Sequence, residues 1–164
     1  MPNVDDGLSS GFKSSLHQVE FVGSHPPNVD TEKTVPLYSA LHAAIRAGLP
    51  RSAATPNKGG LTVSLARCAL AADLGLEVDL DDCPGMAGLE DDVALFSESN
   101  GRFVVTLAAD QTEDFERQME GTACCRAGVV TDEPRLLIRR DGRALVDSDL
   151  ASLRSRFKEG LEHA

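Results

Sequence analysis

Residues 95–107 read Leu-Phe-Ser-Glu-Ser-Asn-Gly-Arg-Phe-Val-Val-Thr-Leu. The first two residues are typical of an apolar helix end, and the last five form a β-branched run typical of a strand. Between them, Asn100-Gly101 is a strong turn signal. We therefore predict a short helix over 91–96, a polar loop over 97–102 and a strand over 103–107. Polar loops held by a rigid strand often carry function.

A second informative segment lies upstream, where Asn57-Lys58-Gly59-Gly60 precedes an Ala-rich stretch. We predict a helix here, capped by Asn57 and ending near Gly75. Glycines at a helix start leave backbone N–H groups unshielded, and the helix dipole and the Lys58 charge add positive potential there. Such a place suits a phosphate or a carboxylate. The alternative is that the glycines only allow the helix to pack tightly on a strand.

The polar loop 97–102 also has two interpretations. Glu98 is either a ligand contact or the partner of Arg102 in a surface ion pair, which would contribute little. Ser97 and Ser99 either hydrogen-bond a ligand or satisfy the turn. From the local pattern alone, the structural interpretation is slightly favoured at this loop and at the glycine pair.

The remaining pattern indicates alternating helices and strands, followed by a late hairpin at Asp141-Gly142. We predict further helices over 35–47, 110–121 and 148–160. Further strands are predicted over 51–55, 76–80, 128–131, 135–138 and 144–146. This order favours an α+β fold with a mixed β-sheet and helices packed on it. Residues 1–17 are expected to be a disordered or truncated N-terminal segment, and 18–164 one domain.

Composition narrows the class of protein. The chain has 164 residues and a formal net charge of -10, which argues against nucleic acid or anionic membrane as a partner. The start, Met-Pro-Asn-Val-Asp-Asp, is unlike a signal peptide, and no apolar run could span a bilayer. The four cysteines, at 68, 83, 124 and 125, contain no C-x-x-C pair. Reduced thiols in a cytoplasmic protein are therefore favoured over a zinc site.

Three blocks, Gly59-Gly60-Leu61-Thr62-Val63-Ser64-Leu65-Ala66, residues 74–80 and residues 95–107, resemble in this order the C-terminal domain of the AIR synthase-like superfamily. Within it, the Phe-Ser-Glu-Ser-x-Gly-Arg block is most similar to the phosphoribosylformylglycinamidine synthase family. The resemblance runs from about residue 19 to the C-terminus and implies that family's fold, partly ferredoxin-like. Two departures are clear. Ala54-Thr55 stands where the family often has His-Asp, and Arg67 stands where it often has an acid.

The resemblance implies a role in de novo purine biosynthesis, namely ATP-dependent amidation of formylglycinamide ribonucleotide with glutamine-derived ammonia. The complete enzyme would use ATP and Mg, an ATP-binding domain and a glutaminase subunit. This chain alone would be inactive and hold no tightly bound cofactor. A homodimer is a further expectation. The alternatives are a non-catalytic assembly module and a relative of hydrogenase-maturation or selenophosphate synthases. The expected phosphate- or substrate-binding residues are Asn57, Lys58, Gly59, Gly60, Ser97, Glu98, Ser99 and Arg102.

Overall fold

The computed structural model describes residues 29–162, so the prediction for residues 1–17 lies outside the described residues. The helices are α2 (Thr31–Arg46), α3 (Gly60–Ala72), α4 (Asp91–Phe96), η2 (Ala109–Gln111, a 3-10 turn), α5 (Thr112–Gln118) and α6 (Leu150–Glu162). The strands are β1 (Pro50–Ala54), β2 (Gly75–Asp79), β3 (Val104–Leu107), β4 (Gly128–Thr131), β5 (Arg135–Arg140) and β6 (Arg143–Asp149).

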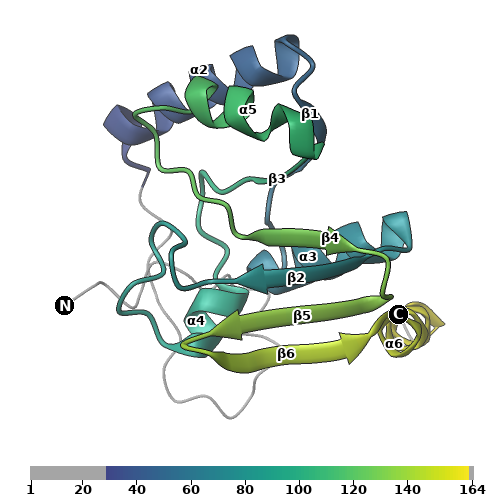
Figure 1. Cartoon of the computed structure of the whole chain (residues 1–164). Helices are drawn as coiled ribbons and strands as arrows, with labels where there is room; N and C mark the ends of the chain where they lie inside the picture. Colours follow the sequence, from purple (N-terminus) through teal and green to yellow (C-terminus); the bar gives the residue numbers. More distant parts are fainter. Residues whose placement is uncertain (1–28, 163–164) are drawn as a thin grey trace.

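The main sheet has four strands in the order β4-β2-β5-β6 (Figure 1). Its central pair, β2 and β5, is parallel, with Val78 opposite Ile138. The outer pairs, β2–β4 and β5–β6, are antiparallel. The α+β class and the mixed sheet predicted from the element order are therefore confirmed.

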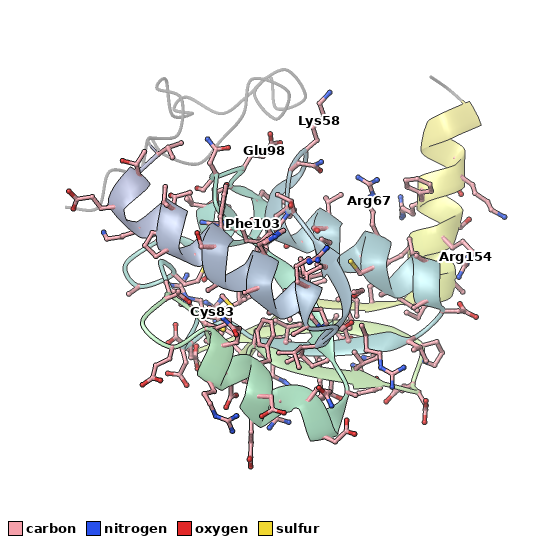
Figure 2. All side chains as sticks on the ribbon, turned by 90° about the horizontal axis from the view of Figure 1, so that it is seen from above. Lys58, Arg67, Cys83, Glu98, Phe103 and Arg154 are labelled. Carbon is pink, nitrogen blue, oxygen red and sulfur yellow. The ribbon has the colours of Figure 1, made fainter. Side chains whose placement is uncertain are left out.

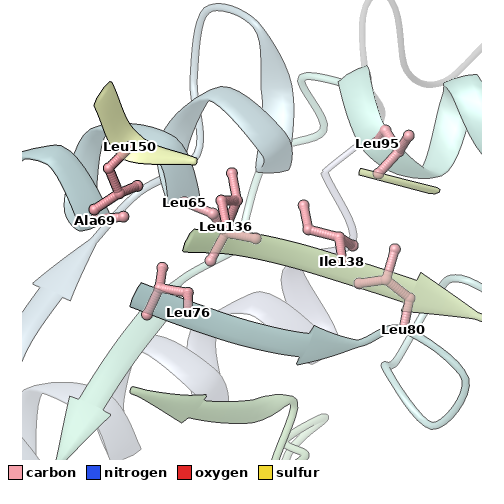
Figure 3. Packing of buried hydrophobic residues seen from close by; sticks show 8 residues of the cluster. All are labelled: Leu65, Ala69, Leu76, Leu80, Leu95, Leu136, Ile138 and Leu150. Carbon is pink, nitrogen blue, oxygen red and sulfur yellow. The ribbon is translucent and has the colours of Figure 1, made fainter. Parts of the chain in front are cut away.

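One apolar core fills the space between this sheet and the helices α3, α4 and α6 (Figure 3). Leu136 and Ile138 are both fully buried, because residues two apart on a strand share a face. They meet Leu65 and Ala69 of α3 and Leu95 of α4. Burying a leucine side chain stabilises a fold by about 1.5–3 kcal/mol, so this cluster fixes α3 on the sheet.

A second, smaller core lies beneath α2 and α5, which pack beside the two-stranded ribbon β1–β3 (Figure 1). Leu41 and Ala44 of α2 and Phe115 of α5 are buried in it. The Phe103 ring, just before β3, meets the Tyr38 ring edge-on with centroids 5.3 Å apart. The strand predicted from the opening segment therefore joins the two cores, since Val104 packs on the first and Val105 on the second.

Two local signals explain where elements begin and turn. The Asp30 side chain accepts hydrogen bonds from the backbone N–H groups of Glu32 and Lys33, so α2 begins one turn before its predicted start. At the β5–β6 hairpin, Asp141 and Gly142 both have positive φ, 52° and 68°. These values are those of the type I′ turn that Asp-Gly favours, and the predicted hairpin is confirmed.

Over residues 29–162 the structure contains no helix that combines the length and the apolar character needed to cross a membrane. The extent of the domain beyond these residues stays a prediction.

Truncation of the first core should be costly. We expect Leu136→Ala to lower the free energy of unfolding by about 2–5 kcal/mol, because it leaves a cavity in the fully buried cluster. Urea titration followed by circular dichroism measures this. Leu74→Ala removes the same atoms from a side chain that is 36% exposed and should cost less than about 1 kcal/mol. Equal losses for the two variants would contradict the assignment of this core.

Candidate functional site

The two segments singled out from the sequence lie against each other. The backbone N–H of Gly59 donates a hydrogen bond to Oε1 of Glu98 at 2.8 Å, across 39 positions of sequence. Lys58 and Glu98 accordingly lie on the same side of the molecule (Figure 2). The loop before α3 and the loop after α4 thus form one surface feature, which we call the loop pair, residues 57–60 and 97–102.

A close backbone approach holds the loop pair together. Gly60 begins α3 with φ of 68°, and a Cβ placed on it would lie 2.5 Å from the carbonyl carbon of Phe96. Only glycine tolerates both the positive φ and the contact. The tight-packing interpretation of the glycine pair is therefore supported, although the neighbour of Gly60 is the end of α4 rather than a strand.

The predicted cap of α3 is wrong. The helix begins at Gly60, and Gly59, in the left-handed region at φ 85°, takes the N-cap position without any side-chain cap. Asn57 contributes its backbone carbonyl, which accepts from Gly60 N–H at 2.7 Å. Because Glu98 accepts from Gly59, both glycine N–H groups already have partners within the protein. They are not free to bind an anion in this conformation.

Arg102 supplies positive charge to the loop pair. Its Nη1 donates to the hydroxyl oxygen of Ser97 at 2.7 Å, and Ser97 is only 1% exposed. Burial lowers the pKa of the Arg102 guanidinium, which still remains charged because arginine titrates far above neutrality. No carboxylate of residues 29–162 lies within ion-pair distance of the Arg102 guanidinium. The Glu98–Arg102 pair, one of the two interpretations of this loop, does not form; the Glu98 carboxylate accepts from Gly59 instead.

Thr62 is a further candidate that was not predicted from the sequence. The Thr62 hydroxyl, two residues into α3, is the one buried side-chain oxygen or nitrogen of the described residues without a hydrogen-bond partner. Buried hydroxyls are rarely left unsatisfied, so a water or a ligand atom is expected near it. In the sequence, Thr62 is marked only by its place three residues after Gly59, in the first turn of α3. Of the predicted residues, Asn57 and Lys58 are exposed, while Ser99 is half-buried on the second loop.

Two other polar regions, the carboxylates after β2 and a hollow beside α6, are weaker candidates for a binding site. The carboxylates of Asp79 and Asp81 accept backbone N–H groups of Asp81 and Asp141, and no cluster of metal-ligating side chains occurs within residues 29–162. A hollow of about 460 Å³ beside α6 lies away from the loop pair, and its Arg154 is paired with Asp73 at 2.7 Å.

Comparison with known proteins gives one family. Residues 5–140 match the sequence model of the family described as AIR synthase related protein, C-terminal domain. Over 155 residues, 94% of the chain, the sequence is 32% identical to phosphoribosylformylglycinamidine synthase subunit PurL of Methanocaldococcus jannaschii. The chain spans about a fifth of the length of the curated relatives it matches.

Solved structures show the same fold. Thermotoga maritima PurL complexed with FGAR has a TM-score of 0.69 at 18% identity, covering 83% of this chain and 23% of that one. The T. maritima PurLQS structure has a TM-score of 0.65 at 19% identity, covering 74% and 21%. The hydrogenase maturation protein HypE is more distant, with a TM-score of 0.57 at 16% identity, covering 89% and 50%.

Glycine at position 60 should be indispensable for packing. We expect Gly60→Ala to destabilise the fold by about 2–4 kcal/mol, combining the strain of a positive φ with the clash against Phe96. Gly121→Ala is the matched control, because its φ is 79° and nothing lies within 4 Å of the added Cβ. It should cost only about 1 kcal/mol. If thermal unfolding shows equal losses for both variants, the Gly60–Phe96 contact does not constrain the fold.

Proposed function

The chain belongs to the family of AIR synthase related proteins, as their C-terminal domain, and on that premise we propose that it is the C-terminal domain of a phosphoribosylformylglycinamidine synthase. Its part in this role is to present the loop pair to the phosphate group of formylglycinamide ribonucleotide. The observation that carries the proposal is Arg102, a half-buried guanidinium without a carboxylate partner among residues 29–162.

A desolvated positive charge favours an anionic ligand, because hydrogen bonds between charged groups strengthen where water is excluded. Arg102 uses one donor on Ser97 and has further N–H donors to offer. Exposed Lys58, on the other loop, adds a second positive charge. The unsatisfied Thr62 hydroxyl offers a neutral donor at the start of α3. A phosphate monoester matches this set of donors.

The role of Glu98 follows from its bond to Gly59. Its carboxylate occupies a backbone N–H that a phosphate would otherwise use, and it joins the two loops. We assign Glu98, Gly59 and Gly60 to holding the two loops together. The residues that we assign to binding the phosphate are Lys58, Thr62, Ser97 and Arg102. Asn57 and Ser99 belong to the same loops and stay predicted contacts.

The chain matches about a fifth of the length of its relative PurL, and we assign the remaining steps of the reaction to the rest of that enzyme. T. maritima PurL has been solved in complex with ATP. That structure matches this chain with a TM-score of 0.63 at 20% identity, and the match covers 21% of the PurL chain. ATP and Mg²⁺ would act at the ATP-binding domain, and ammonia would come from a glutaminase partner. We place this ligase chemistry in the cytoplasm. The 164 residues alone are proposed to lack it.

A second candidate role, assembly, is favoured by β4. This strand lies at the edge of the main sheet, where Val129 and Val130 are 46% and 48% exposed. An edge strand with exposed valines is a template for pairing with another strand. A homodimer formed through β4 would be compatible with phosphate binding at the loop pair.

Phosphate binding is tested by calorimetry with formylglycinamide ribonucleotide and, separately, with ribose 5-phosphate. We expect a millimolar dissociation constant for both, since the phosphate is the shared group. Arg102→Gln should weaken binding by about 10- to 150-fold, because it removes a charged hydrogen bond of about 1.5–3 kcal/mol. Arg67→Gln, which removes an exposed charge from α3, should leave the constant unchanged within about twofold.

Absence of heat at about 10 mM ligand, with the protein folded by circular dichroism, would overturn phosphate binding at the loop pair. Equal weakening by both arginine variants would indicate long-range charge attraction instead of a site. Neither result would alter the family to which the chain belongs.

The assembly role predicts a concentration-dependent dimer. Light scattering at high micromolar concentration should give twice the monomer mass. Val130→Lys should return the chain to a monomer, because an edge lysine opposes strand pairing. Val35→Lys changes another exposed valine, 60% exposed on α2, and should leave the dimer intact. A monomer at every concentration would remove the homodimer from consideration.

A further inference from the structure

Two cysteines far apart in sequence meet beside the main sheet. Cys83 lies in the loop that follows β2, and Cys125 lies shortly before β4. The Cys125 thiol donates a hydrogen bond to Sγ of Cys83 at 3.4 Å, across 42 positions of sequence. Both side chains are half-buried, and all four cysteines of the chain are free thiols. This pairing could not be predicted from the sequence, which contains no C-x-x-C motif.

Backbone hydrogen bonds fix both segments. Cys83 N–H donates to the carbonyl of Leu80 at 3.2 Å, which closes a tight turn after β2. On the other side, Asp79 N–H donates to the carbonyl of Ala127 at 2.7 Å, two residues beyond Cys125. The backbone positions of both cysteines therefore follow from the β2–β4 pairing.

The loop that carries Cys83 is anchored at its far end as well. The Arg140 guanidinium, at the end of β5, donates to the carbonyls of Met86 and Leu89 at 3.0 and 2.8 Å. Only 12% of its side chain is exposed. The two thiols are thus held near each other by contacts from three neighbouring strands, β2, β4 and β5.

We propose that Cys83 and Cys125 form a redox-modifiable dithiol, which a low-molecular-weight disulfide such as oxidised glutathione converts into an intramolecular disulfide. A disulfide needs a sulfur–sulfur distance of about 2.05 Å, so the two sulfurs must approach by about 1.4 Å. Side-chain rotation supplies such a movement without unpairing the strands.

The chemistry is thiol–disulfide exchange in two steps. The Cys125 thiol loses its proton, and its sulfur attacks one sulfur of the oxidant, breaking that S–S bond and releasing one small thiolate. The Cys83 thiol loses its proton in turn, and its sulfur attacks Cys125 Sγ, releasing the second thiolate. Both thiolates take up the protons. The two protein sulfurs are oxidised by two electrons in total, and the oxidant is reduced to two thiols.

The order of attack follows from the surroundings of the two thiols. Burial, followed by the neighbouring Cys125 thiol and the Asp79 and Asp82 carboxylates, raises the pKa of the Cys83 thiol to about 12. Cys83 is therefore the weaker first nucleophile at neutral pH and acts second, when Cys125 already lies beside it as a mixed disulfide. Cys124 is exposed, and no sulfur contact to it is found among the described residues.

The test is incubation of the folded, reduced 164-residue chain with oxidised glutathione, followed by alkylation and peptide mapping by mass spectrometry. We expect a chain that has lost two hydrogens and that yields a linked peptide pair containing Cys83 and Cys125. Cys83→Ser and Cys125→Ser should abolish the linked product. Cys124→Ser and Cys68→Ser should form it at a rate within about twofold of the parent chain.

Three results would overturn the proposal: a chain that only accumulates mixed disulfides with glutathione, a linkage of Cys124 to Cys125, or loss of the linked product in Cys124→Ser. Circular dichroism of each reduced variant checks its folding. If Cys83→Ser does not fold, the linked peptides of the parent chain decide alone, because their fragmentation between Cys68 and Cys83 and between Cys124 and Cys125 identifies the bonded cysteines.

Discussion

The start of α3 rests on the end of α4 without room for a side chain between them, and the arrangement of both cores and both loops depends on this contact. A Cβ at Gly60 would meet the Phe96 backbone at 2.5 Å. Because Leu65 lies five residues after Gly60 and Leu95 directly precedes Phe96, the same contact brings two apolar faces over the sheet. The polar residues beyond the helix ends then necessarily face each other, and β3 leaves from there toward the second core.

In the loop pair, Glu98 connects the two loops, whereas Arg102 bonds to a residue of its own loop. Glu98 directs its carboxylate to a backbone N–H of the opposite loop, so its charge serves the structure. Arg102 is partly desolvated, and within residues 29–162 its side chain donates to a neutral hydroxyl, that of Ser97. If the same two residues were paired with each other, the site would be a neutral surface contact of small energetic consequence. Their separation leaves the Arg102 charge without a carboxylate partner among residues 29–162, on a chain whose net charge is -10.

Two features concern the edge of the main sheet and the length of the chain relative to similar proteins. The domain matches about a fifth of the length of its relatives, and one edge of its main sheet exposes valines. The residues near this edge also include the Cys83–Cys125 pair, whose position follows from the pairing of β2 with β4. The same pairing therefore determines both the exposed edge and the approach of the two thiols.

The amino-acid sequence correctly predicts the α+β class, most element positions and the Asp141-Gly142 hairpin, because hydrophobic periodicity and turn chemistry are local properties. It also identified both loops that form the candidate site. Tertiary contacts determine that Glu98 bonds to Gly59 and that Asn57 does not cap α3. Among residues 29–162, they also leave Arg102 without a carboxylate partner and the buried Thr62 hydroxyl without a hydrogen-bond partner. Each of these depends on a contact between residues distant in sequence, such as the 39 positions from Gly59 to Glu98, and no local pattern encodes such distances.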